Sequence, residues 1–152
     1  MITDDGIRNL IKLEHLNLSG NSNITDDGIK ILTNITNLEF YEDNYLITDN
    51  GIMRLVNIKS LDITYAKLIN DDGIKNLTNI TSLYVNERIS DKGIKNLTNI
   101  TTLDCFNNYK ITDNGIKHLT NITDLNFHNN NVITDNGIKY LTNLIRLNLQ
   151  RN

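Results

Sequence analysis

The feature that most constrains the fold of this chain is a segment of about 22 residues that recurs along all of its 152 residues. Each copy contains one glycine, and successive glycines are 20 to 23 residues apart. These glycines are Gly6, Gly28, Gly51, Gly73, Gly93, Gly115 and Gly137. A fixed period of this length is the signature of proteins whose units stack on their neighbours. The sequence therefore predicts a solenoid.

Six positions of the repeat hold an apolar residue in all seven copies. In the second copy they are Ile24, Ile29, Leu32, Ile35, Leu38 and Phe40. Equivalent side chains point the same way in a stack of units, so we expect one continuous core. The single cysteine, Cys105, occupies the position of Phe40 in its own copy. We expect it to be a buried small apolar residue rather than a nucleophile.

Each repeat divides into a strand and a helix. The alternation in Leu16-Asn17-Leu18 predicts a short strand with its middle residue facing outward. Further along, each copy has a residue that favours a helix N-cap, followed by aspartate. These N-cap residues are Thr3, Thr25, Thr48, Asn70, Ser90, Thr112 and Thr134. We expect helices of about two turns that end near Asn34 and its equivalents, where asparagine can adopt the left-handed conformation.

A family resemblance follows from two segments of this pattern. They are Leu13-x-x-Leu16-x-Leu18-x-x-Asn21-x-x-Ile24 and Ile122-x-x-Leu125-x-Phe127-x-x-Asn130-x-x-Ile133. Both resemble leucine-rich repeats, and the resemblance covers the whole chain. It implies an α/β horseshoe arc of about seven repeats, a single domain over residues 1–152, with a parallel concave sheet and short convex helices.

The ITDxGI motif further resembles the cysteine-containing subclass found in F-box proteins. The positions of that subclass's cysteine hold other residues here: Asn21, Asp43, Ala66, Arg88, Asn108, Asn130 and Asn152. The composition is also similar to that of leucine-rich-repeat proteins from giant viruses and AT-rich microbes. If the chain is viral, we expect it in the host cytoplasm.

Charge and hydropathy limit the classes of partner. The net charge of −3 gives no basic field for nucleic acid or an anionic membrane, so we expect neither partner. No apolar run approaches the roughly 20 residues that span a bilayer. One cysteine cannot form an internal disulfide, and no leader opens the chain, so we expect a cytoplasmic protein.

Three residues, His118, Asp124 and His128, form the one cluster that suggests catalysis or metal binding. The repeat register puts His118 on the helical side and the other two on the strand side. Asp124 and His128 are about 13 Å apart along an extended strand, too far for one metal ion. We therefore expect surface residues, no metal, no cofactor and no enzyme.

A ladder of basic residues occupies one helix position: Arg8, Lys30, Lys75, Lys95, Lys117 and Lys139. It could bind a polyanion. Each lysine, however, lies four residues after the invariant aspartate, as Lys30 follows Asp26, which favours a helical ion pair. The preferred interpretation is a solvated, neutralised face.

The outward strand positions vary between copies, and this variation suggests a binding site. Aromatic residues gather from the second repeat to the fifth at Tyr41, Tyr65, Tyr84 and Phe106, and acids accompany them at Glu39, Glu42, Asp62, Glu87 and Asp104. In the same region an extra residue lies between Leu38 and Ile47, and Ala66 and Arg88 replace the repeat's asparagine. Neutral drift would also explain these departures. Aromatic anchors and acids would select a protein or peptide with basic groups.

We therefore predict a non-enzymatic module that binds a protein or peptide through its concave face. Two alternatives remain: a structural or self-assembling repeat scaffold, and the substrate-recognition part of a ubiquitin ligase. Neither end of the chain offers the polar cap that shields a solenoid core. This predicts a piece of a longer array, or ends that pack against something else.

Overall fold

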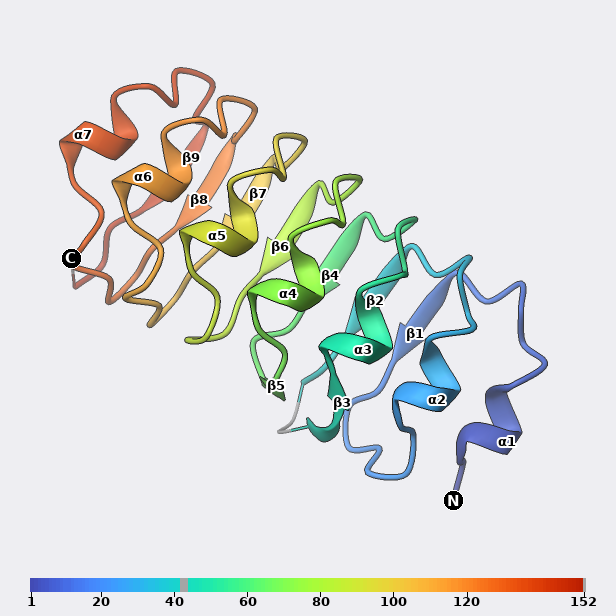
Figure 1. The fold of residues 1–152 in the computed structure, drawn as a ribbon. Coiled ribbons are helices and arrows are strands. Elements are labelled where there is room, and N and C mark those ends of the chain that lie inside the picture. The colour runs from blue at the N-terminus through green and yellow to red at the C-terminus, as the bar shows by residue number, and fades with distance from the viewer. Residues whose placement is uncertain (42–43, 152) are drawn as a thin grey trace.

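The computed structural model describes residues 1–41 and 44–151, and in it the chain winds into a two-layered solenoid. Figure 1 shows strands forming one layer and short helices the other, with the termini at opposite ends. The helices of the described residues are α1 (Asp4–Ile7), α2 (Asp26–Ile29), α3 (Asp49–Ile52), α4 (Asp71–Ile74), α5 (Asp91–Ile94), α6 (Asp113–Ile116) and α7 (Asp135–Ile138). The predicted α/β solenoid is confirmed.

One parallel sheet runs the length of the solenoid in the order β1-β2-β4-β6-β7-β8-β9. Its strands are β1 (His15–Asn17), β2 (Asn37–Glu39), β4 (Ser60–Asp62), β6 (Ser82–Tyr84), β7 (Thr102–Asp104), β8 (Asp124–Asn126) and β9 (Arg146–Asn148). Every pair keeps the same register, with Leu38 opposite Leu61 and Leu61 opposite Leu83. Equivalent side chains therefore form straight rows across the sheet.

The helices begin as expected but are shorter. Five of the N-cap side chains, those of Thr25, Thr48, Ser90, Thr112 and Thr134, accept a hydrogen bond from the backbone N–H two residues later. Thr3 and Asn70 have the extended cap backbone without this bond. The expectation of two turns is wrong, because each helix is a single turn of four residues.

The chain leaves each helix through tight turns that explain its length. After α2, the N–H of Leu32 donates to the carbonyl of Ile29 at 2.9 Å, and the N–H of Ile35 donates to that of Leu32 at 3.1 Å. Turns of three residues bring Ile29, Leu32 and Ile35 to the core in succession. A continued α-helix, with about 3.6 residues per turn, would rotate the third of these away. The three-residue spacing of the apolar positions in the sequence already indicated these tight turns.

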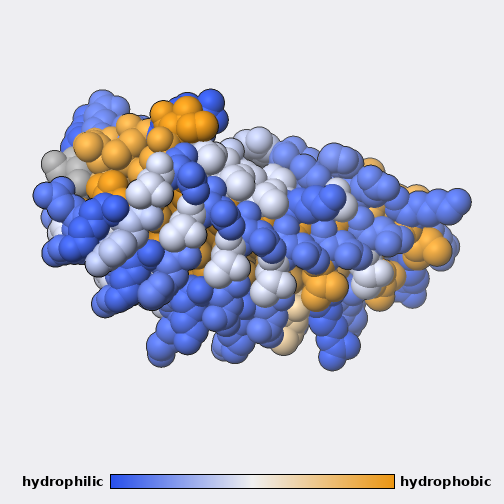
Figure 2. Space-filling view, turned by 90° about the horizontal axis from the view of Figure 1, so that it is seen from above, coloured by the Kyte–Doolittle hydropathy of each residue, from blue (hydrophilic) through white to orange (hydrophobic). Residues whose placement is uncertain are grey.

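The six apolar positions form the core. In the five inner copies every one of them is buried, Cys105 included. In the outer copies several are exposed, among them Leu10, Leu147 and Leu149. Figure 2 shows a hydrophobic area at the C-terminal end of the molecule, where Ile145 is also exposed.

A second, smaller sheet interrupts the regular pattern. It pairs β3 (Asn44–Thr48) with β5 (Ala66–Leu68) in parallel, with an irregular register between Asn44 and Thr48. This sheet follows the extra residue between Leu38 and Ile47. The added length lets the second and third coils extend beside each other where other coils make turns. This second sheet was not predicted from the sequence.

Invariant aspartates join one coil to the next. Asp91, at the start of α5, accepts hydrogen bonds from the backbone N–H of Thr112 at 2.7 Å and from its hydroxyl at 2.8 Å. A Cβ added to Gly115 would lie 2.3 Å from Asp91 Oδ1, so glycine is required for this close approach. The predicted pairing of Asp26 with Lys30 is wrong, because the Asp26 carboxylate instead accepts hydrogen bonds from the N-cap residue Thr48.

Buried asparagines form a second ladder between coils. The Nδ2 of Asn108 donates to the carbonyl of Asn86 at 2.8 Å, and Asn86 donates to the carbonyl of Ala66 at 2.8 Å. Asn130 donates in turn to Asn108. The prediction that Arg88 takes the asparagine position is wrong. The loop from Leu83 to Ile89 is two residues shorter than its equivalents, so Asn86 fills that position and is buried, whereas Ala66 does replace an asparagine. The predicted repeat positions of Asp43 and Asn152 lie outside the described residues.

Candidate functional site

The concave layer presents one central row of outward side chains. The row is Asn17, Glu39, Asp62, Tyr84, Asp104, Asn126 and Asn148, each opposite the next in the sheet register. Adjacent strands lie about 4.8 Å apart, so neighbours in the row are within reach of one another. Four of the predicted site residues, Glu39, Asp62, Tyr84 and Asp104, therefore share one line across the face.

Most members of the central row also serve the fold. Five are asparagine or aspartate, and the Oδ1 of each accepts a hydrogen bond of 2.8 to 3.0 Å from the backbone N–H two residues later. This Asx turn directs the chain out of the strand. Asp62 and Asp104 are thus partly structural. Within the described residues, Glu39 and Tyr84 are the members of the row that make no such turn.

Glu39 is the centre of an acidic and aromatic cluster. Its Oε2 accepts a hydrogen bond from Asn17 Nδ2 at 3.1 Å. The Glu39 carboxylate raises the pKa of the Tyr41 phenol, and burial, Asp62 and Tyr84 add to this effect. Tyr41 lies just past the end of β2 and is 54% exposed. The structure therefore brings together Glu39, Tyr41, Asp62 and Tyr84, which we call the concave cluster.

Phe106 belongs to a neighbouring group. Its ring meets that of His128 edge-on, with 5.1 Å between the ring centroids and 80° between the planes. Next to it, Asn126 Nδ2 donates to Asp104 Oδ2 at 2.8 Å. The pairing of Phe106 with His128 was not predicted, because the two residues are one repeat apart.

The remaining candidates lie at the margin of the face. Tyr65 is in the turn between β4 and β5 and is 43% exposed, at the rim of the concave layer. Glu87 is exposed in the loop after β6. Glu42 lies outside the described residues.

A pocket of about 340 Å³ opens on the C-terminal half of the concave face. Tyr84, Asp104, Asp124 and Arg146 are among its lining residues. The guanidinium of Arg146 pairs with Asp124 at 2.6 Å. Tyr84 therefore belongs to the concave cluster and also lines this pocket, and both carry acidic side chains.

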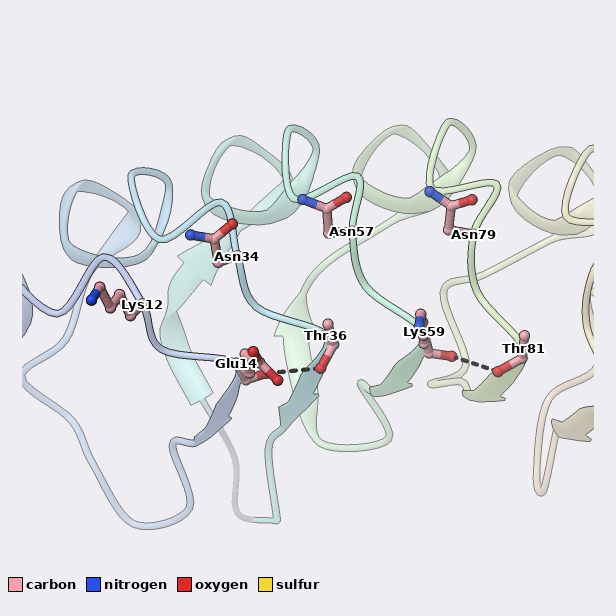
Figure 3. A pocket seen from close by; sticks show the side chains of 8 residues that line it. All are labelled: Lys12, Glu14, Asn34, Thr36, Asn57, Lys59, Asn79 and Thr81. Carbon is pink, nitrogen blue, oxygen red and sulfur yellow. Dashed lines mark hydrogen bonds between the residues drawn. The ribbon is translucent and has the colours of Figure 1, made fainter.

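A larger groove of about 780 Å³ runs along one edge of the solenoid (Figure 3). Its polar groups bind neighbouring coils. Asn34 Nδ2 donates to the carbonyl of Ile11 at 2.7 Å, and the Thr36 hydroxyl donates to the carbonyl of Glu14 at 3.2 Å. The expectation that Asn34 ends a helix in the left-handed conformation is wrong, since it is not among the positive-φ residues of the described chain. The groove is a product of stacking.

The suspected catalytic residues do not converge. His118 is exposed on the helical side, whereas His128 packs on Phe106. Burial raises the pKa of the Cys105 thiol far above its usual range, and Asp104 adds to this. The described residues contain no group of three His, Cys, Asp or Glu side chains that could hold a metal ion. Nor is any described helix long and apolar enough to cross a membrane.

Comparisons with known proteins agree with this geometry. Residues 9–32, 54–78 and 118–142 match the family model described as Leucine Rich repeat. An internalin (inlF) from Listeria monocytogenes is similar in structure, with a TM-score of 0.76 and 30% identity over 94% of this chain and 43% of that one. An internalin C2 (inlC2) from the same organism has a TM-score of 0.69 and 26% identity over 99% of this chain and 76% of that one.

A structure of the TLR13–ssRNA13 complex has a TM-score of 0.76 and 21% identity over 100% of this chain and 24% of that one, a likeness of fold alone. Because that complex contains RNA, the prediction from net charge that nucleic acid is not a partner of this chain is not supported. No curated protein has a sequence that matches this chain. The comparisons indicate no enzyme family, and they support neither the F-box-associated nor the giant-virus subclass. The chain spans less than half of the inlF structure.

Proposed function

Because the chain is a leucine-rich-repeat solenoid, we propose that it is a non-enzymatic interaction module that binds a protein or peptide on its concave face. The observation that carries this proposal is the central row, in which Glu39 and Tyr84 stand where the other members form Asx turns. Within the described residues neither side chain forms the Asx turn that the other members contribute, and the fold contact that Glu39 makes is its hydrogen bond with Asn17. With Tyr41 and Asp62, Glu39 and Tyr84 form the concave cluster.

The chemistry of the cluster favours a basic partner. Tyr41 and Tyr84 supply rigid amphipathic surface, the kind that dominates interface energies. Glu39 and Asp62 would pair with lysine or arginine side chains and disfavour acidic ones. Phe106, Asp104 and Tyr65 would extend the contact toward the rim and the C-terminal pocket. A strand or loop with alternating basic and apolar residues fits such a face.

Alanine substitution at both Tyr41 and Tyr84 tests the proposal. We expect the double variant to lose capture of a partner from lysate while it keeps the wild-type circular dichroism spectrum. The matched control replaces Tyr109 and Tyr140, each 51% exposed and outside the central row. Equal capture by wild type and both double variants would refute the concave site.

The scaffold alternative has its own test. Sedimentation across a hundredfold range of concentration separates a monomeric binder from a chain that assembles end to end. Growth in mass with concentration would favour the scaffold. A ubiquitin-ligase role would require an adaptor in the captured complex, which mass spectrometry of the same pull-down would detect.

A further inference from the structure

The convex face changes its charge along the solenoid, at the second residue of each helix. This residue is aspartate in α1, α2 and α4, asparagine in α3, α6 and α7, and lysine in α5. The residue three positions later lies just after the helix, and it is basic in every repeat except that of α3. The nature of the second residue therefore decides whether that base is neutralised.

Where the second residue is aspartate, an ion pair forms. Asp27 and Lys30 are 2.5 Å apart in α2, and Asp72 and Lys75 are 2.5 Å apart in and after α4. The pair of Asp5 and Arg8 at α1 measures 3.0 Å. The predicted neutralised ladder thus exists, but it uses the second aspartate instead of the invariant one, and it stops after α4.

At α5 the arrangement is reversed. Lys92 stands in the aspartate position, three residues before Lys95, so two like charges share one face of the helical turn. In the described structure neither lysine has an ion pair, and the exposed Arg88 lies just upstream. One substitution in the repeat has turned an ion pair into a cationic cluster.

This cluster borders a depression of about 660 Å³ between α4 and α5, which lie side by side in Figure 1. Its charged lining is Asp71, Asp72, Lys75, Arg88, Lys92 and Lys95, four cations and two acids. Both acids are already engaged. Asp71 accepts hydrogen bonds from the N–H and hydroxyl of Ser90 at 2.7 and 2.6 Å, and Asp72 binds Lys75.

The local electrostatics reflect this excess of cations. A hydrogen bond from Lys75 and its charge lower the pKa of the Asp72 carboxyl, and Lys92 of the next coil adds to the effect. Lys92 is therefore only partly balanced, from across the depression. The two acids of the lining, Asp71 and Asp72, are both bound to other groups, and neither forms an ion pair with Lys95 or Arg88 in the described structure.

We propose that Arg88, Lys92 and Lys95 form a second binding site, the convex basic site, for an acidic peptide segment. Three cations suit two or three carboxylates, whereas nucleic acid gains affinity by neutralising many phosphates along a longer track. The acids that pair with bases at α1, α2 and α4 would repel such a polyanion. The amides of Asn76 and Asn96 in the same lining can bind a peptide backbone. This site lies on the opposite layer from the concave cluster, so one solenoid could hold a basic and an acidic partner together.

Replacing Lys92 by aspartate tests the convex basic site with little risk to the fold, because it restores the sequence pattern of α2. The probe is a fluorescein-labelled hexaglutamate peptide, and the measurement is fluorescence anisotropy at low ionic strength. We expect K92D to weaken binding by about tenfold or more, through the loss of one contact and the new repulsion. K12D has the same change in net charge at a residue in the edge groove, and we expect less than a twofold effect.

Three results would overturn the proposal. The first is no binding of hexaglutamate by the wild type, and the second is an equal loss in K92D and K12D, which would indicate a response to net charge alone. The third uses hexathymidylate of similar charge as a second probe. If it binds more tightly than hexaglutamate and depends on Lys92, the surface would be a nucleic-acid site.

Discussion

Repeats five to seven and repeats two to four use the same frame differently. In the later repeats the polar side chains of both rows form contacts that stabilise the fold. Asn108 and Asn130 continue the buried ladder, and Asp104 and Asn126 form Asx turns. In the earlier repeats Ala66 ends the ladder, and Glu39 and Tyr84 interrupt the Asx row. The second sheet also lies there.

This difference shows how to find candidate functional residues in a repeat protein. A polar residue that recurs in every copy most often binds the next coil, so its recurrence reports folding. A residue that breaks the central row no longer forms the Asx turn that its equivalents form. By this criterion Glu39 and Tyr84 are stronger candidates than Asp62 and Asp104, although all four were predicted from one variable surface.

The largest effect is expected from breaking the buried ladder. Asn108 donates to the carbonyls of Asn86 and Ile89 and accepts from the N–H groups of Lys110 and Ile111. Asn108→Ala leaves these buried groups without partners and should cost about 3 kcal/mol of unfolding free energy, measured by urea denaturation. Asn99, exposed and bound to a single carbonyl, is the control; its alanine variant should cost about 1 kcal/mol. Equal losses would refute the ladder's role.

A smaller loss is expected at the invariant glycine. In an ordinary helix Gly→Ala stabilises by up to about 1 kcal/mol. Gly115→Ala should instead destabilise by about 2 kcal/mol, because the new Cβ displaces Asp91 from Thr112. Gly6 is the control, since a Cβ there would meet only Ile2 Cγ2 at 3.3 Å. Thermal melts of both variants should shift in opposite directions or differ clearly in size.

The central row allows a side chain that stabilises the fold to be compared with one that is proposed to bind a partner. Asp104→Ala removes an Asx turn and should cost about 1 kcal/mol of stability. Glu39→Asn installs the regular residue and should leave stability within about 0.5 kcal/mol while it weakens partner capture. Denaturation and pull-down of both variants check the pair. Loss of stability without loss of capture in Glu39→Asn would contradict its assignment.

The smallest effect is expected on the convex surface. Asp27→Asn converts the ion pair with Lys30 into the arrangement of α6, where Lys117 binds Asn114 at 2.9 Å. Because exposed pairs contribute little, the melting temperature should change by less than about 2 °C. A shift of several degrees would mean that these pairs hold the coils together.

Much of the fold could be read from the sequence, since contacts within one repeat leave a local pattern. The apolar positions gave the core, and the N-cap column gave the helix starts. Contacts between repeats leave no such pattern, because their partners are about 20 residues apart. Asp26 was therefore assigned to Lys30 instead of Thr48, and Arg88 was assigned to the asparagine position that Asn86 fills. For the site, the sequence identified its members but not which of them the fold already uses.

The central claim, that the concave face is the binding face, can be measured by photo-crosslinking. Benzoylphenylalanine is placed at Tyr84 or, on the convex side, at Tyr140, and the chain is irradiated in lysate. We expect one protein to crosslink from position 84 and not from position 140, with competition by the uncrosslinked wild type. The same protein crosslinked equally from both positions, or from 140 alone, would contradict the account.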